Sequence, residues 1–100
     1  MTMTSIYRDP RPYGLEFVGE IEWCGESYRY DVTAVWASRD TMVFYWLNER
    51  GCSCPVPFDT VTSLDQLCSG NVWQVVEHLR RRDALRSETL VDLVRRWPLP

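Results

Sequence analysis

The sequence has no hydrophobic run that approaches the roughly 20 residues of a membrane-spanning helix. Its first residues, MTMTSIYRDPRP, also lack the apolar core that a secretory signal places behind a basic start. We therefore expect a cytoplasmic protein with no membrane partner, in which the thiols of the four cysteines stay reduced.

Features of catalytic sites are also scarce. His78 is the single histidine, and the sequence around it offers no nucleophile with an orienting acid. There is no glycine-rich loop of the kind that holds phosphate. Lysine is absent, and eleven arginines in its place fit a GC-rich coding genome as well as selection for guanidinium chemistry. We expect a protein that is not an enzyme, with a cysteine–histidine pair from distant segments as the open alternative.

The charge is unevenly distributed along the 100 residues. Residues 1–68 hold ten acids and five arginines, a balance of −5, whereas residues 69–100 hold six arginines and four acids, a balance of +2. The basic run RRRDALR could attract a phosphate backbone, but a broad basic face is missing. Nucleic-acid binding is therefore a minor alternative, and it would use Arg80, Arg81, Arg82 and Arg86.

Alternating apolar residues predict three antiparallel strands. The first covers residues 15–23, and its two faces would carry Leu15, Phe17, Ile21 and Trp23 on one side and Glu16, Glu20 and Glu22 on the other. The second covers residues 28–36, with one face formed by Tyr28, Tyr30, Val32, Ala34 and Trp36. A length of 100 residues with 45% hydrophobic residues is enough for one folded domain.

The third predicted strand, residues 41–49, is apolar on both faces. Met42, Phe44 and Trp46 would lie on one face, and Val43, Tyr45 and Leu47 on the other. One face joins the core, so the second must be covered by a helix, by the proline-containing segment or by another protein. Cover from within the chain is favoured, because exposed apolar strands promote aggregation.

Helix signals occur only in the last third of the chain. Thr62 or Ser63 can cap a short turn that ends at Gly70, and Asn71 with Gln74 forms a capping box before a helix. Ser87 can cap a second helix that Pro98 ends. The predicted fold is α+β, a three-stranded antiparallel meander covered by C-terminal helices. Its parts are an extended arm at 1–14, the meander at 15–49, a Cys/Pro corner at 50–61 and helices at 62–97.

The corner GCSCPVPF raises the question of metal or thiol chemistry. A zinc site would need Cys52, Cys54 and Cys68 together with Cys24 or His78, but the C-x-C spacing suits zinc poorly. A disulfide between Cys52 and Cys54 would be strained and easily reduced. We favour a stiff corner in which the cysteines are buried as small apolar residues and Phe58 anchors the segment in the core. No cofactor is expected, and zinc is the alternative.

Residues 15–68 resemble a family of small uncharacterised proteins encoded by tailed phages of actinobacteria. The most specific shared motif is G-C-S-C-P-x-P-F, followed by an acid and a T-S-L-D-x-L turn; Val56 stands where a small polar residue is expected. The resemblance implies a phage origin and action in the cytoplasm of an infected host, with virion association left open. The family provides no activity to carry over and says nothing about catalysis, and the C-terminal helices resemble no named family.

These observations predict a small accessory protein that binds a host or phage protein without catalysis, in host takeover or in countering host defence. The expected surface is the second face of the third strand, Val43, Tyr45 and Leu47, or the acidic face, Glu16, Glu20 and Glu22. A second copy of the chain could occupy either face as a homodimer. A zinc- or thiol-dependent module at the corner and nucleic-acid binding are the alternatives.

Overall fold

The computed structural model describes residues 4–25, 28–52 and 57–98. Its strands and helices are β1 (Glu16–Glu22), β2 (Arg29–Ala37), β3 (Phe44–Cys52), β4 (Cys68–Gly70), α1 (Val72–Arg82) and α2 (Glu88–Arg96). The strands form one antiparallel sheet in the order β1-β2-β3-β4. The predicted α+β fold with C-terminal helices is confirmed, but the sheet has four strands rather than three.

β4 lies in a segment that the sequence predicted as a helical turn ending at Gly70. The turn is present as a 3-10 helix, Leu64–Gln66, capped by Ser63 and Gln66 as a capping box. The chain then straightens, and Cys68–Gly70 pairs with the first three residues of β3. Three residues are too few to show alternation, so this strand is set by its pairing partner. β3 itself continues to Cys52, beyond the predicted end of the meander at residue 49.

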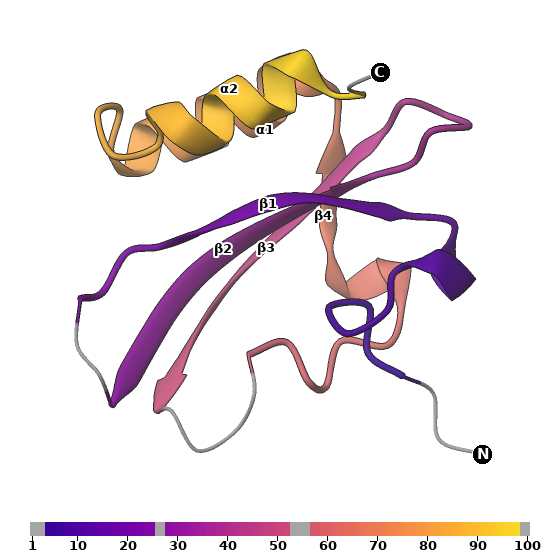
Figure 1. The fold of residues 1–100 in the computed structure, drawn as a ribbon, viewed down its shortest axis with the longest axis horizontal. Helices are drawn as coiled ribbons and strands as arrows, with labels where there is room; N and C mark the ends of the chain where they lie inside the picture. The colour runs from indigo at the N-terminus through magenta and orange to yellow at the C-terminus, as the bar shows by residue number, and fades with distance from the viewer. Residues whose placement is uncertain (1–3, 26–27, 53–56, 99–100) are drawn as a thin grey trace.

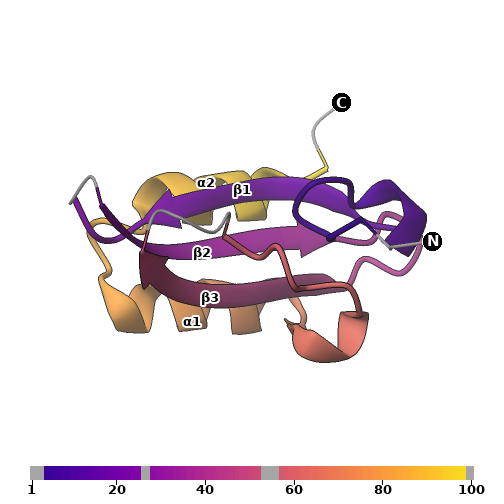
Figure 2. The same cartoon turned by 90° about the horizontal axis from the view of Figure 1, so that it is seen from below.

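The sheet is covered on both faces. Figure 1 shows α1 and α2 over one face, with the N-terminal segment and the chain before β4 below the other. Figure 2, seen from below, shows these two segments crossing the strands. The second apolar face of the third strand is therefore covered from within the chain, as the sequence favoured.

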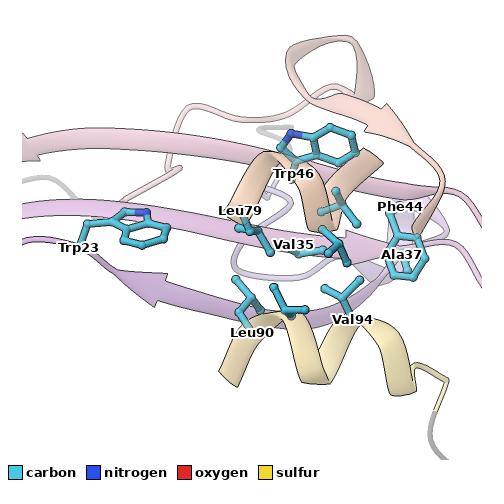
Figure 3. Packing of buried hydrophobic residues seen from close by; sticks show 11 residues of the cluster. Trp23, Val35, Ala37, Phe44, Trp46, Leu79, Leu90 and Val94 are labelled. Atoms are coloured by element: carbon cyan, nitrogen blue, oxygen red, sulfur yellow. The ribbon is translucent and has the colours of Figure 1, made fainter. Parts of the chain in front are cut away.

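The helix-side cluster fills the space between the sheet and the two helices (Figure 3). Its buried members are Trp23, Val35, Ala37, Phe44, Trp46, Val75, Val76, Leu79, Leu90, Val91 and Val94. Gly19 lets α2 approach β1 closely, because a Cβ there would lie 2.9 Å from Leu90 Cδ1 and 3.0 Å from Leu93 Cδ1. Close packing of this kind makes the position of α2 depend on a residue without a side chain.

The arm-side cluster lies on the opposite face of the sheet. Its buried members are Ile6, Leu15, Val32, Ala34, Trp36, Phe58, Val61 and Leu67. Phe58 is fully buried and meets Trp36 edge to face at 5.8 Å between ring centroids. Glu49 Oε2 accepts a hydrogen bond from the Phe58 backbone N–H at 2.9 Å. The predicted role of Phe58 as the anchor of the corner is confirmed.

A β-bulge in β1 overturns the predicted faces of that strand. The register shifts between Phe17 and Gly19, so one extra residue separates the two halves of the strand. Leu15 and Phe17 consequently contact the arm side, whereas Ile21 and Trp23 pack in the helix-side cluster. The four residues do not share one face, because the prediction assumed unbroken alternation.

The N-terminal segment is folded rather than extended. Residues Arg11–Tyr13 form a 3-10 helix that begins after Pro10 and contains Pro12 in its first turn. Proline is compatible with the start of a helix, because its φ is already helical and its missing N–H would have no partner there. The prediction of an extended arm was wrong because it treated both prolines as helix breakers.

The two helices begin where the sequence placed them. Asn71 and Gln74 form the expected capping box at the start of α1, through hydrogen bonds of 3.0 and 2.8 Å. Ser87 precedes α2, but its hydroxyl donates to the carbonyl of Ala84 at 3.3 Å and makes no capping bond. The prediction of a serine cap was therefore correct in position and wrong in mechanism.

Candidate functional site

The predicted surface on the third strand is engaged by the chain itself. Tyr45 and Leu47 are half-buried and pack against the arm-side cluster. Val43 is half-buried in the turn before β3, where its carbonyl accepts a hydrogen bond from the Ser38 backbone N–H at 2.9 Å. A partner at this face would have to displace residues that already cover it.

The predicted acidic row is divided by the bulge and engaged by neighbours. Glu16 lies opposite Ala37 in the β1–β2 register and is therefore on the helix side of the sheet. Its carboxylate accepts hydrogen bonds of 2.7 and 3.0 Å from the Arg39 guanidinium, and these bonds lower the pKa of Glu16. Glu20 accepts a hydrogen bond of 2.7 Å from the Tyr7 hydroxyl. Burial, reinforced by this bond, raises the pKa of Tyr7 to about 12.

Glu22 accepts hydrogen bonds from backbone N–H groups at the end of β1. Its Oε1 accepts hydrogen bonds of 2.9 Å from the backbone N–H groups of Cys24 and Asp31. This carboxylate therefore closes the β1–β2 connection. Glu16, Glu20 and Glu22 do not form one cation-binding row, since each carboxylate has a separate partner.

The described cysteines do not converge on one point, and Cys52 is exposed, so the prediction that the cysteines of the corner are buried as small apolar residues is wrong for Cys52. Cys24 and Cys52 line the same cavity of about 380 Å³ at the ends of β1 and β3. Cys68 pairs with Trp46 of β3. Trp46 lies six residues before Cys52 on the same strand, so Cys68 and Cys52 are about 20 Å apart along the strand. Cys54 lies outside the described residues. Within residues 4–25, 28–52 and 57–98, no three potential metal ligands of the His, Cys, Asp or Glu types gather.

The arginines of the basic run point to different partners. Arg80 lies 3.7 Å from Glu88, and Arg81 donates to Glu77 at 2.6 Å. Arg86 donates to the carbonyl of Glu22 at 3.2 Å, and Arg82 reaches the sheet. The four side chains are therefore spread along α1 and the loop after it, and each has a polar partner within the chain.

Arg82 is part of a polar network at the edge of the helix-side cluster. Trp23 Nε1 donates to Thr33 Oγ1 at 2.8 Å, and Thr33 donates in turn to Asn48 Oδ1 at 2.5 Å. Asn48 Nδ2 donates to Asp31 Oδ1 at 2.9 Å. Arg82 closes the network by donating to Asn48 Oδ1 at 3.2 Å and to both oxygens of Asp31. The network ties the C-terminal turn of α1 to the first three strands.

Asp31 carries the negative charge of this network. Burial acts to raise its pKa, but hydrogen bonds from Arg82 and Asn48 outweigh burial and leave that pKa below its usual value. Arg50 lies 3.4 Å from the same carboxylate. Arg82 also lies over the Trp23 ring, 4.9 Å from its centroid, and Arg86 lies 5.7 Å from that centroid. One half-buried carboxylate therefore holds two guanidinium groups.

A cleft of about 490 Å³ opens beside this network, between β3 and the end of α1. We call it the Arg82 cleft, and its lining comprises Trp23, Thr33, Asn48, Arg50, His78, Leu79, Arg81 and Arg82. His78 also contacts Trp46, with 5.8 Å between ring centroids. Burial, followed by the charges of Arg81 and Arg82, lowers the pKa of His78. The sequence analysis singled out His78, Arg81 and Arg82 on α1, but no local pattern linked them to Thr33, Asn48 and Arg50, which lie on β2 and β3.

A second feature lies on the outer face of α1. Trp73 is 69% exposed, which is unusual for the largest apolar side chain in a protein of this size. It borders a groove of about 480 Å³ that Val76, Glu77, Arg80 and Arg81 also line. These residues follow the helical spacing of one face of α1, so we call this surface the Trp73 groove.

Comparison with known proteins places the chain in a family. The model of one family, described as Domain of unknown function (DUF7574), matches residues 4–96. The chain belongs to this family. The match spans the arm, the sheet and both helices, so the fold described here is the family's unit. Comparisons with curated proteins and with solved structures gave no match. Neither helix in the described part of the chain is long and apolar enough to span a membrane.

Proposed function

We propose that this protein acts without catalysis by binding another protein through the Trp73 groove. The observation that carries the proposal is the exposure of Trp73 beside two arginines on a helix whose opposite face is buried. Tryptophan and arginine are the residues that most often dominate the binding energy of protein interfaces. The surface of the third strand, which the sequence predicted, is a weaker candidate for the interface, because Tyr45 and Leu47 already pack within the chain.

The groove also indicates the character of the partner. Trp73 offers an exposed apolar surface, and Arg80 and Arg81 offer guanidinium groups whose present carboxylate partners are on the same helix or its neighbour. Such exposed ion pairs are weak and exchange easily. A partner with an apolar side chain flanked by carboxylates fits this arrangement. The resemblance to actinobacteriophage proteins supports a search for it among host and phage proteins in the infected cytoplasm.

The test begins with affinity capture from infected actinobacterial cells and continues with the purified partner. We expect Trp73→Ala to weaken binding at least about tenfold, as loss of an interface tryptophan usually does. Leu85→Ala is the matched control, because Leu85 is 85% exposed and lies beyond the far end of α1. Unchanged melting temperatures would show that both variants fold.

A second copy of the chain is tested in the same way. A dimer in sedimentation velocity that Trp73→Ala converts into a monomer would identify a second copy as the partner. The proposal is refuted if Trp73→Ala and Leu85→Ala bind every captured partner equally well and the wild-type chain remains a monomer.

A further inference from the structure

The Arg82 cleft contains more positive than negative charge at its surface. Arg50, Arg81 and Arg82 all line it, and among the described residues that do so none carries a carboxylate. Asp31 is only 13% exposed in its side chain and is shared by Arg50 and Arg82. Glu77, the partner of Arg81, lies outside the lining. Two buried or distant carboxylates thus face three guanidinium groups.

The three guanidinium groups differ in how firmly they are held. Arg82 is fixed by Asp31, by Asn48 and by the Trp23 ring, and its side chain is 33% exposed. Arg50 touches Asp31 through a contact of 3.4 Å, and its side chain is 74% exposed. The cleft therefore combines a preorganised cation with exposed cations that can close on a ligand, an arrangement that reduces the entropy cost of binding.

From this geometry we propose that the Arg82 cleft binds a small organic anion through a phosphate or carboxylate group held by Arg50, Arg81 and Arg82. Guanidinium groups bind both kinds of anion through paired hydrogen bonds. A volume of about 490 Å³ lies within the range of small-molecule sites, so the cleft has room for more than the acid group. Trp23 and Leu79 supply the apolar wall for the uncharged part of the ligand.

The test is a nuclear magnetic resonance titration of the full chain that follows the Trp23 indole N–H and the Asn48 side-chain amide. The probes are inorganic phosphate, adenosine monophosphate, benzoate and adenosine. We expect saturable shifts with the anions and none with adenosine, which lacks an acid group. The tighter of adenosine monophosphate and benzoate identifies whether phosphate or carboxylate is preferred.

Variants at exposed arginines show whether the cleft is responsible. Arg50→Ala should weaken anion binding about tenfold, since a hydrogen bond to a charged group is lost. Arg39→Ala is the control, because Arg39 binds Glu16 away from the cleft and should leave affinity unchanged. Arg50→Lys should bind with intermediate affinity, because the charge remains without the paired donors.

Two results would overturn the proposal: no saturable shift with any of the three anions, or an equal loss of affinity in Arg50→Ala and Arg39→Ala. Arg81 lines both the cleft and the Trp73 groove, so variants at residues that belong to one site alone distinguish the two proposals. Trp73→Ala should retain anion binding, and Arg50→Ala should retain a protein partner bound at that groove.

Discussion

Thr33 joins two polar side chains that come from different strands and face the helices. Its hydroxyl accepts the Trp23 indole N–H and donates to Asn48. Thr33 is 2% exposed and Trp23 is 7% exposed, so water has little access to either group. A buried donor without a partner carries the cost of its lost hydration, which makes this hydroxyl more important than its size suggests.

We expect Thr33→Val to lower the free energy of unfolding by about 1–3 kcal/mol, the usual cost of leaving a buried polar group unsatisfied. The shape of the side chain is nearly kept, so the loss would reflect the hydrogen bonds rather than packing. Urea denaturation measures the change. Thr41→Val, at an exposed turn position, is the control and should have little effect. Equal stability of Thr33→Val and the wild type would show that the network contributes nothing to folding.

β3 shows how far alternation can predict the environment of a strand. Its pattern correctly predicted that Phe44 and Trp46 share one face and that Tyr45 and Leu47 share the other. It could not predict what covers the second face, because the covering residues, Ile6 to Leu15 and Phe58 to Leu67, are distant in sequence. β2 followed its alternation as well, from Tyr30 to Trp36.

β1 was predicted less well for a physical reason. The bulge between Phe17 and Gly19 adds one residue to the strand, and the prediction overlooked the two signals that mark it: Val18 is apolar on the otherwise acidic face, and Gly19 follows it. By contrast, the start of α1 was predicted to the residue, since Asn71 and Gln74 are the first and last positions of one four-residue local motif. Local signals were therefore reliable where the structure depends on neighbours in sequence.

The cover over β3 leads to a test of the interface first predicted. Tyr45→Asp should destabilise the protein by about 2 kcal/mol or more, because it places a charge among the residues of the arm-side cluster. Tyr28→Asp is the matched control; Tyr28 is 61% exposed and should tolerate the change. The melting temperatures of the two variants make the comparison. If Tyr45→Asp and Tyr28→Asp have the same melting temperature, the face of Tyr45 is open to solvent, and the strand surface is again a candidate interface.

At the scale of the molecule, the fold brings the two unequal charge regions together. Arg82 binds Asp31, 51 residues earlier, and Arg86 binds the carbonyl of Glu22, 64 residues earlier. The sequence predicted that the C-terminal helices cover the sheet, but not that the arginines of the basic tail pair with Asp31 and with the Glu22 carbonyl. It could not predict the Arg82 cleft, whose lining comes from β2, β3, α1 and Trp23, the residue that follows β1. Such a site follows from topology rather than from any motif.

His78 makes the stability of this assembly sensitive to mild acid. Burial and the charges of Arg81 and Arg82 lower its pKa in the folded protein, whereas the unfolded chain keeps a value of about 6.5. As the pH falls below about 6.5, the unfolded chain takes up a proton that the folded protein resists, so folding stability decreases. Asp31, whose folded pKa is also lowered, adds a separate decrease below about pH 4.

We therefore expect the urea midpoint of the wild-type protein to fall between pH 7.5 and pH 5, and that of His78→Gln to stay nearly constant over this interval. Both proteins should lose stability below about pH 4, because Asp31 is present in each. A parallel decline of the two midpoints from pH 7.5 to pH 5 would show that His78 titrates alike in the folded and unfolded states. That result would mean that the contact with Trp46 and the charges of Arg81 and Arg82 leave the proton affinity of the exposed His78 unchanged on folding.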